Sequence, residues 1–155
     1  MPEKNTLAVQ AIKHGTVIDH ITAGLALKII RFLNLAAHEK LVTVGLNLPS
    51  RLMKKKDLIK VAGLEISPEQ ANEVALLSPN ATVNIIRDYA VAKKYSLKLP
   101  EVITHLLVCP NPTCITNHER MDTRFGCEKV GKGVTVRCHY CERIFTLAEI
   151  TSYNL

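Results

Sequence analysis

The sequence contains no tryptophan, and aromatic residues make up only 5% of its 155 residues. It has no uninterrupted apolar run near the roughly 20 residues that a membrane-spanning helix needs, so we expect no transmembrane segment. No apolar stretch follows residues 1–6, so no secretory signal is expected and the cytoplasm is the predicted compartment. The glycines are scattered and form no phosphate-binding loop. The remaining composition, 47% hydrophobic and 22% charged, is typical of a folded protein.

Positive charge and cysteine are each confined to one part of the chain. Residues 1–100 carry fourteen Lys and Arg against eight Asp and Glu, whereas residues 101–155 carry six of each sign, so the net charge of +6 belongs to the first part. All five cysteines, in contrast, follow residue 108. This asymmetry predicts two domains, residues 1–100 and residues 101–155. The charge of the first domain indicates an anionic partner.

The cysteines form two pairs with the spacing of a metal site. Four residues separate Cys109 from Cys114, two separate Cys138 from Cys141, and 23 residues lie between the pairs. Two such turns can bring four thiolates together as a tetrahedral cage, which is the geometry of structural zinc sites. The spacing therefore predicts one structural Zn²⁺ held by these four cysteines, with iron as the alternative metal. A filled shell of four ligands leaves no position for catalysis.

Other interpretations of these residues are disfavoured. Disulfides are uncommon in the expected cytoplasmic setting. A redox dithiol at Cys138 and Cys141 would normally open a helix and would have no second pair beside it. Because the paired cysteines suffice as ligands, we expect Cys127 to be a core thiol and expect His118 and His139 to be surface imidazoles.

Short apolar stretches around the cysteine pairs indicate β-strands. They cover residues 102–108, 134–137 and 143–146. A domain of this size buries little apolar surface, and a structural metal commonly compensates for that. The second domain is therefore predicted to be a small zinc-ribbon or rubredoxin-like β domain.

The first domain alternates between strand and helix patterns. The predicted elements, in order, are a strand at 7–12, a helix at 23–35 capped by Asp19 or Thr22, strands at 41–48 and 58–62, a helix from Pro68 to Leu77 with Ser67 as its N-cap, and a strand at 81–89. A basic linker follows at 92–100. This βαββαβ order is that of the ferredoxin-like fold, with two helices on one face of an antiparallel sheet. We therefore predict an α+β chain whose first sheet leaves one face free for a ligand or a partner chain.

The residues of the first domain favour polyanion binding over catalysis. No nucleophile or metal accompanies the polar pair Asp19-His20, and its spacing alone favours a helix cap and a surface histidine. The cations fall in two distant clusters, at 54–60 and 93–94, suited to nucleic acid or to the phosphates of a nucleotide. Nucleic acid is the second choice, because stacking aromatics are scarce and the cysteine-bearing domain has no net positive charge.

Several distinctive segments then point to a known family. They are residues 11–13, 15–20, 44–50, 56–60, 81–84 and 107–111, together with the spacing of the four paired cysteines. Through them the chain resembles, from about residue 7 to residue 147, the regulatory chains of aspartate carbamoyltransferase, the first committed enzyme of pyrimidine biosynthesis. The resemblance implies a non-catalytic subunit that binds CTP as inhibitor and ATP as activator at one site in the first domain.

The resemblance also implies which residues form the nucleotide site, and it reverses the cap interpretation of Asp19. Main-chain groups near Ala11, Ile12 and Tyr89 are implied to bind the base, with Val17 and Ile86 lining the pocket. Asp19 and Lys60 are implied to contact the ribose, and the residues implied to lie by the phosphates are His20, Asn84, Val91 and Lys94. Lys56 is implied to belong to a neighbouring site for a second nucleotide.

The implied partners are other protein chains, with no nucleic acid and no membrane among them. In the family, the zinc domain docks on the catalytic chain, and the first domain pairs as a homodimer. Catalytic trimers and regulatory dimers together form a dodecamer. The sequence departs from the family pattern at Gln10, where an acidic residue is expected, at His14, in place of a larger cation, and at Thr113, in place of an amide.

Overall fold

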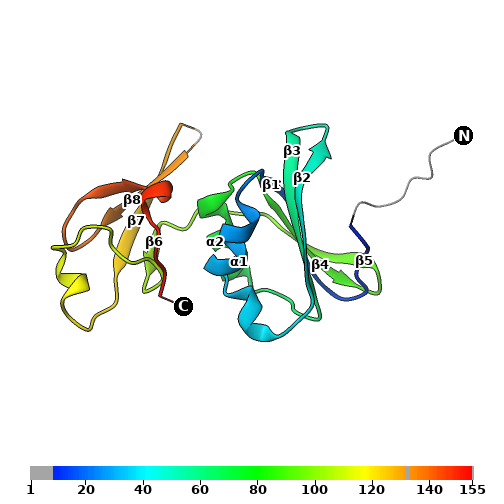
Figure 1. The fold of residues 1–155 in the computed structure, drawn as a ribbon, viewed down its shortest axis with the longest axis horizontal. Helices are drawn as coiled ribbons and strands as arrows, with labels where there is room; N and C mark the ends of the chain where they lie inside the picture. Colours follow the sequence, from blue (N-terminus) through cyan, green and yellow to red (C-terminus); the bar gives the residue numbers. More distant parts are fainter. Residues whose placement is uncertain (1–8, 132, 155) are drawn as a thin grey trace, which may run out of the picture. The chain divides into compact units, whose positions relative to one another are not determined.

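The computed structural model describes residues 9–131 and 133–154. The chain divides into two compact units, the first ending at Leu97 and the second beginning at Lys98. Each unit has its own antiparallel sheet, and helices are few, which confirms the α+β class (Figure 1). None of the helices in the described ranges is long and apolar enough to cross a membrane.

The first unit contains the predicted βαββαβ order and one further strand. Its elements are β1 (Gly15–Thr22), α1 (Ala26–Phe32), the 3-10 turn η1 (Leu35–His38), β2 (Val42–Ser50), β3 (Lys54–Ala62), α2 (Pro68–Leu77), β4 (Thr82–Arg87) and β5 (Ala90–Tyr95). The strands lie in the order β2-β3-β1-β4-β5, and every neighbouring pair is antiparallel. The ferredoxin-like prediction is confirmed, with β5 as an added edge strand.

Several boundaries predicted for this unit were wrong. The helix predicted at 23–35 is α1 at Ala26–Phe32, and the strand predicted at 58–62 begins at Lys54. The strand predicted at 7–12 is not found: residues 9–12 form no strand, and residues 7–8 lie outside the described residues. The first strand begins at Gly15 instead. Gly15 has a φ of 140°, and a Cβ there would overlap the carbonyl oxygen of Val61, so only glycine allows β1 to meet β3 at this point. Residues 92–95 of the predicted linker instead belong to β5 (Ala90–Tyr95), whose exposed edge position gives no apolar alternation.

The start of α1 is held by Asp57, and neither predicted cap, Asp19 or Thr22, serves it. Asp57 is fully buried, with 0% exposure. One carboxylate oxygen accepts hydrogen bonds from the backbone N–H groups of Gly24 (2.9 Å) and Ala26 (3.1 Å). The second oxygen accepts from the N–H of Asn47 at 3.0 Å. A carboxylate on β3 thus fixes both the helix start and the neighbouring strand β2.

β-Bulges in the two strands that flank β3 explain this arrangement. In β1 the register against β3 shifts between Ile18 and Ile21, and in β2 it shifts between Gly45 and Leu48. Asn47, inside the second bulge, has a positive φ of 56°, which turns its N–H out of the ladder. The Asp57 carboxylate accepts a hydrogen bond from that N–H.

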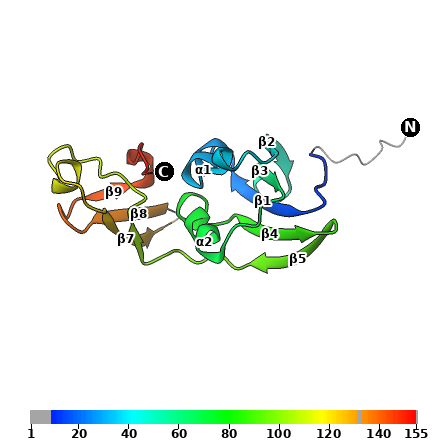
Figure 2. The same ribbon diagram turned by 90° about the horizontal axis from the view of Figure 1, so that it is seen from below.

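Both helices of the first unit pack on one face of its sheet (Figure 2). Side chains of the three central strands on this face are at most 1% exposed and form the core with both helices; they are Ile18, Ile59, Val61, Val83 and Ile85. The second helix begins with the predicted capping box, in which Ser67 and Gln70 each accept a hydrogen bond from the other's backbone N–H. No helix of this unit covers the opposite face within the described residues, and we call it the uncovered face.

The second unit is a four-stranded antiparallel sheet with loops that carry the cysteine pairs. Its elements are β6 (Val102–Thr104), the 3-10 turn η2 (Ile115–Asn117), β7 (Arg124–Val130), β8 (Gly133–Cys138), β9 (Ile144–Thr146) and the 3-10 turn η3 (Leu147–Glu149), with strand order β6-β7-β8-β9. Strand β7 was not predicted, because charged residues and Gly126 interrupt its apolar pattern. Strand β6 is shorter than the predicted 102–108.

Replacing Asp57 should destabilise the first unit more than any exposed acidic substitution. Asp57→Ala removes the acceptor of three backbone N–H groups, of which that of Ala26 is buried, so we expect the free energy of unfolding to fall by about 2–4 kcal/mol. Urea denaturation followed by circular dichroism measures this. The matched control is Asp88→Asn on the exposed β4–β5 turn, which should change stability by less than about 0.5 kcal/mol. Equal stability of the two variants would contradict the role assigned to Asp57.

Candidate functional site

Four cysteine sulfurs of the second unit lie close together. The Sγ atoms of Cys109, Cys114, Cys138 and Cys141 all lie within 4.8 Å of one another. The distances between Cys109 and Cys141 and between Cys114 and Cys138 are both 3.7 Å. Zinc–sulfur bonds of about 2.3 Å in a regular tetrahedron place the sulfurs about 3.8 Å apart. The cluster therefore fits a tetrahedral metal ion, and the sulfurs are too far apart for disulfides.

Backbone turns hold the cysteines in this position. In the first turn the N–H of Cys114 donates to the carbonyl of Asn111 at 3.0 Å, and the Asn117 amide donates to the carbonyls of Cys109 and Asn111. In the second turn the N–H of Glu142 donates to the carbonyl of Cys138 at 2.9 Å, and Glu142 itself has a left-handed φ of 62°. Both turns direct two sulfurs to one point.

The thiols of the cluster differ in acidity. Burial raises the pKa of Cys109 and of Cys138 above the ordinary value. Burial acts the same way on Cys141, but hydrogen bonds from the Arg143 backbone and the Asn111 side chain outweigh it and lower the pKa to about 7. A dication among the four sulfurs favours their thiolate forms, so metal binding and proton release are coupled.

The remaining cysteine and the nearby histidines lie outside this cluster. Cys127 is half-buried on β7, and burial raises its pKa to about 11. The side chains of His118 and His139 are exposed, and His118 Nε2 lies 2.8 Å from the carbonyl of Pro112. The exposed histidines agree with the expected surface imidazoles. Cys127 was expected to be a core thiol, but it is only half-buried, and it takes no part in the cluster.

The uncovered face of the first sheet aligns residues from four strands in one cross-strand row. Lys60 of β3 pairs with Val17 of β1, Val17 pairs with Asn84 of β4, and Asn84 pairs with Lys94 of β5. Directly paired residues point to the same face of a sheet. Lys60 and Lys94, which are distant in the sequence, therefore share a face.

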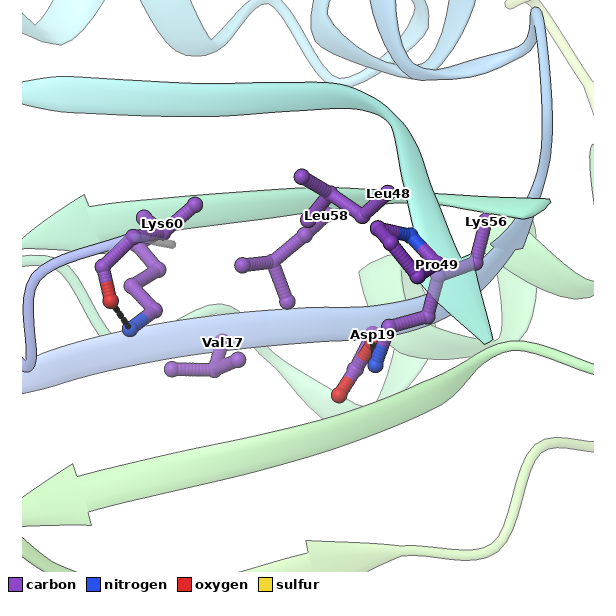
Figure 3. Close-up of a pocket in the computed structure, with 8 residues that line it drawn as sticks. Val17, Asp19, Leu48, Pro49, Lys56, Leu58 and Lys60 are labelled. Atoms are coloured by element: carbon purple, nitrogen blue, oxygen red, sulfur yellow. Dashed lines mark hydrogen bonds and ion pairs between the residues drawn. The ribbon is translucent and has the colours of Figure 1, made fainter. Parts of the chain in front are cut away.

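A cavity of about 360 Å³ lies on this face (Figure 3). Four of the residues expected to contact nucleotide line it, and they are Val17, Asp19, Lys56 and Lys60. Four residues that were not predicted complete its lining, and they are Val9, Leu48, Pro49 and Leu58. The last three belong to strands whose 44–50 and 56–60 segments carried the family resemblance, but a role in the cavity follows only from the folded sheet.

Lys60 is the most buried charged group of the cavity, at 9% exposure. Its Nζ donates to the carbonyls of Val9 (3.2 Å) and Gln10 (2.8 Å), which brings the segment before β1 to the cavity. Burial lowers the pKa of Lys60 below its ordinary 10.5, and the nearby Asp19 carboxylate opposes this shift. Within the described residues both of its hydrogen bonds go to neutral carbonyls, and a buried ammonium in this setting is well suited to an anionic or oxygen-rich ligand.

Asp19 and Lys56 form an ion pair at the other end of the cavity. Their charged atoms are 2.8 Å apart, and both side chains are about one-fifth exposed, at 23% and 21%. Asp19 also accepts a hydrogen bond of 2.6 Å from the N–H of His20. His20 lies in the β1 bulge with a positive φ of 54°, and its Nδ1 is 3.2 Å from Thr82 Oγ1.

The other residues expected at the nucleotide site lie along the β4–β5 hairpin and the segment before β1. Ile86 lies two residues after Asn84 on β4, where it pairs with Gly15 of β1 and with Val91 of β5. Tyr89 occupies the hairpin turn, is 68% exposed, and donates from its N–H to the carbonyl of Lys13 at 2.9 Å. Ala11 and Ile12 precede β1, and neither lines the cavity.

Asn84 holds an unsatisfied polar atom on the same face. Its Oδ1 is buried and has no hydrogen-bond partner in the described part of the chain. An unpaired buried acceptor is costly, so a ligand that donates a hydrogen bond here would be favoured. The sequence offered no indication of this feature.

Comparison with known proteins links both units to one family. Residues 7–98 match the family model described as "Aspartate carbamoyltransferase regulatory chain, allosteric domain". Residues 101–151 match the family model described as "Aspartate carbamoyltransferase regulatory chain, metal binding domain". The chain belongs to the aspartate carbamoyltransferase regulatory chain family. The match to the metal binding domain contains all four clustered cysteines.

Relatives named aspartate carbamoyltransferase regulatory chain come from distant organisms. The chain is 49% identical to that of Aeromonas salmonicida over 146 residues, covering 94% of this chain and 95% of the relative. It is 49% identical to that of Pyrococcus abyssi, covering 93% and 95%. It is 44% identical to that of Photobacterium profundum over 154 residues, covering 99% and 100%. The similarity therefore extends over nearly the whole chain. The protein is a regulatory chain of aspartate carbamoyltransferase with an allosteric and a metal-binding domain. Membership of this family implies a catalytic-chain partner.

Substituting one clustered cysteine of this regulatory chain should abolish metal binding. We expect one metal ion per purified chain, and we expect Cys138→Ser to lose it because three thiolates hold a dication far less well than four. Native mass spectrometry counts the ion. Cys127→Ser is the control and should keep it. Metal retained in Cys138→Ser or lost in Cys127→Ser would show that the cluster is not the ligand set.

Proposed function

We propose that the chain is a non-catalytic, cytoplasmic regulatory subunit that binds CTP as inhibitor and ATP as activator on the uncovered face of its first sheet. The observation that carries this proposal is the cross-strand row that places Lys60 and Lys94 on one face beside the 360 Å³ cavity. Two ammonium groups at separate points of one open face suit a ligand that has a polyphosphate at one end.

The geometry supports separate positions for the parts of a nucleotide. The carboxylate of Asp19 can accept from ribose hydroxyls, and Lys60 lies on the adjacent strand. Lys94 and Asn84 extend the row away from the cavity toward β5, where phosphates would have solvent access. Main-chain groups near Ala11, Ile12 and Tyr89 would bind the base, with Val17 and Ile86 as apolar contacts. His20 and Val91 would adjoin the phosphates, and Lys56 would serve a second nucleotide.

We assign Zn²⁺ to the four-cysteine cluster. The cluster is closed by its own four sulfurs, and Zn²⁺ adopts this tetrahedral thiolate shell in structural sites. Its contribution would be to stabilise the folded second unit, because the sheet there is small and its loops carry the ligands. Iron in the same cage remains the alternative, and a colourless protein with one zinc per chain would exclude it.

The proposed regulation works through differential binding. A nucleotide in the first unit can change catalysis elsewhere only if it binds two states of the assembly with different affinity. Docking of the second unit on the catalytic chain would connect the two sites. Homodimers formed by first units would then join catalytic trimers into a dodecamer, and such an assembly can respond by rigid-body rotation.

Isothermal titration of CTP and ATP into the zinc-loaded chain tests the nucleotide site. We expect the two nucleotides to compete, and we expect Lys60→Ala and Lys94→Ala each to weaken binding about tenfold or more, since each removes a charge-assisted hydrogen bond. Lys93→Ala is the matched control. Lys93 pairs with Ile85, whose side chain lies in the core, so Lys93 points away from the cavity face and its loss should change affinity less than about twofold.

Equal losses at Lys93 and Lys94 would mean that the strand contributes only general positive charge. Absence of binding by either nucleotide to a folded, zinc-loaded chain would contradict the proposed function. Mixing the chain with the catalytic chain and measuring the response of aspartate carbamoylation to CTP and ATP then tests regulation itself.

The affinity for CTP should also fall in alkaline solution because of Lys60. Its pKa is lowered by burial in the free protein, so the ammonium loses its proton at a pH below 10.5. The bound phosphates and hydroxyls favour the charged form, so affinity is constant below this lowered pKa and declines as the pH rises through it. Titrations from pH 7 to pH 10.5 should show the decline. In Lys60→Arg, whose guanidinium stays protonated, this component should be absent.

A further inference from the structure

Strand β2 contains one residue more than the stretch of β3 with which it pairs. Gly45 pairs with Leu58, and Leu48 pairs with Lys56. Three steps along β2 therefore match two steps along β3. The extra residue forms the β-bulge in which Asn47 has its left-handed φ of 56°. Because side chains alternate along a strand, one extra residue moves every later side chain of β2 to the other face of the sheet.

The bulge places Leu48 on the face that carries the cavity. Directly paired residues share a face, and Leu48 and its partner Lys56 both line the cavity (Figure 3). In a ladder without the bulge, Leu48 would pair with Lys55, and its side chain would point toward the helices. Asn47 would then pair with Lys56, so an amide would face the cavity in place of a leucine. The apolar part of the cavity lining therefore depends on the bulge.

The position of Leu48 also affects the segment that precedes β1. A Cβ added to Gly45 would lie 2.7 Å from Leu48 Cδ1 and 3.1 Å from Val9 Cγ2, so both side chains pack over this glycine. The carbonyl of Val9 in turn accepts a hydrogen bond from Lys60 Nζ at 3.2 Å. A displaced Leu48 would therefore alter both the cavity lining and the carbonyl group that Lys60 binds.

Asp57 stabilises the bulge from the opposite face of the sheet. It lies between Lys56 and Leu58, which both line the cavity, so its own side chain points toward the helices. One carboxylate oxygen accepts from the N–H of Asn47 at 3.0 Å, and the other accepts from two N–H groups at the start of α1. The side chain is fully buried, so it offers no surface to a ligand.

We propose that Asp57 is a positioning residue of the nucleotide site, which keeps the β2 bulge in the form that places Leu48 at the cavity. This inference rests on the proposed function of that cavity. Asp57 raises nucleotide affinity without touching the nucleotide. By linkage, a nucleotide that binds the cavity with Leu48 in place stabilises the bulge in return.

The variant Asp57→Asn separates the two contacts of the carboxylate. Its amide oxygen can still accept from Gly24 and Ala26, whereas its NH₂ group then faces the N–H of Asn47, donor against donor. We therefore expect α1 to form and the bulge to loosen. In isothermal titration of CTP into the full-length, zinc-loaded chain, Asp57→Asn should bind about fivefold more weakly, which is the effect of losing part of the apolar contact of a leucine.

A double-mutant cycle with Leu48→Ala distinguishes positioning from general destabilisation. Leu48→Ala should itself weaken CTP binding about fivefold, because it removes the side chain that the bulge places at the cavity. Since Asp57 acts through Leu48, the double variant should bind about as weakly as Leu48→Ala alone. Losses that multiply, to about 25-fold in the double variant, would overturn the inference.

Ser67→Ala is the matched control for stability. It removes the acceptor of the Gln70 N–H, 3.2 Å away in the capping box of α2, and Ser67 does not border the cavity. Ser67→Ala should lower the midpoint of urea denaturation, as Asp57→Asn does, yet keep CTP affinity within about twofold of the unaltered chain. Equal losses of affinity in Ser67→Ala and Asp57→Asn would overturn the inference, as would unchanged affinity in folded Asp57→Asn.

Hydrogen exchange of the unaltered chain tests the same inference without a variant that has to fold. CTP should slow exchange of the Asn47 amide by a larger factor than that of the Gln70 amide, which is bonded to Ser67 away from the cavity. Equal slowing of the two amides would overturn the inference and leave the proposed function standing. Failure of the unaltered chain to bind CTP would instead contradict the proposed function, and this inference with it.

Discussion

The arrangement of the first unit depends on the antiparallel pairing of β1 between β3 and β4. This pairing buries Ile18 between the core residues of its neighbours, and because side chains alternate along a strand, it also directs Val17 and Asp19 to the opposite face. A shift of one residue would exchange the two sets and expose the core. The requirement to bury one face therefore fixes the composition of the other, where Lys60, Val17, Asn84 and Lys94 align.

Asp57 stabilises the irregular parts of that sheet, which border the cavity. The bulges beside it interrupt the regular ladders of β1 and β2, and its carboxylate binds N–H groups that belong to neither ladder. The bulge in β1 contains His20, next to Asp19, and the bulge in β2 comes directly before Leu48. A buried charge thus supports the irregular strand ends that border the cavity, while the regular parts of the sheet supply the core.

Different interactions stabilise the two units. The first unit has two helices packed on a five-stranded sheet, and its core is apolar. The second has four short strands and no α-helix among its described residues, and its sulfur cluster joins loops that are 24 residues apart or more, as for Cys114 and Cys138. A metal ion in that cluster would replace the packing that a larger core supplies.

The sequence alone predicted those features that depend on interactions between residues close together in the chain. The spacing of Cys109, Cys114, Cys138 and Cys141 predicted a cluster because short turns determine where paired sulfurs point, and Ser67 with Gln70 predicted a capping box within one helical turn. The family resemblance indicated the nucleotide site, which sequence spacing by itself did not. Strands whose exposed residues are charged, such as β5 and β7, were missed because apolar alternation is absent from them.

Only the tertiary structure decided which distant residues meet. Asp19 was a candidate helix cap in the sequence, yet it pairs with Lys56 on a sheet face, and the cap is provided by Asp57, 33 residues beyond Gly24. Likewise, no local pattern placed Val9, Leu48 and Lys60 around one cavity. Strand order and register make these contacts, and they follow from burying one face of the whole sheet, which no short segment of sequence records.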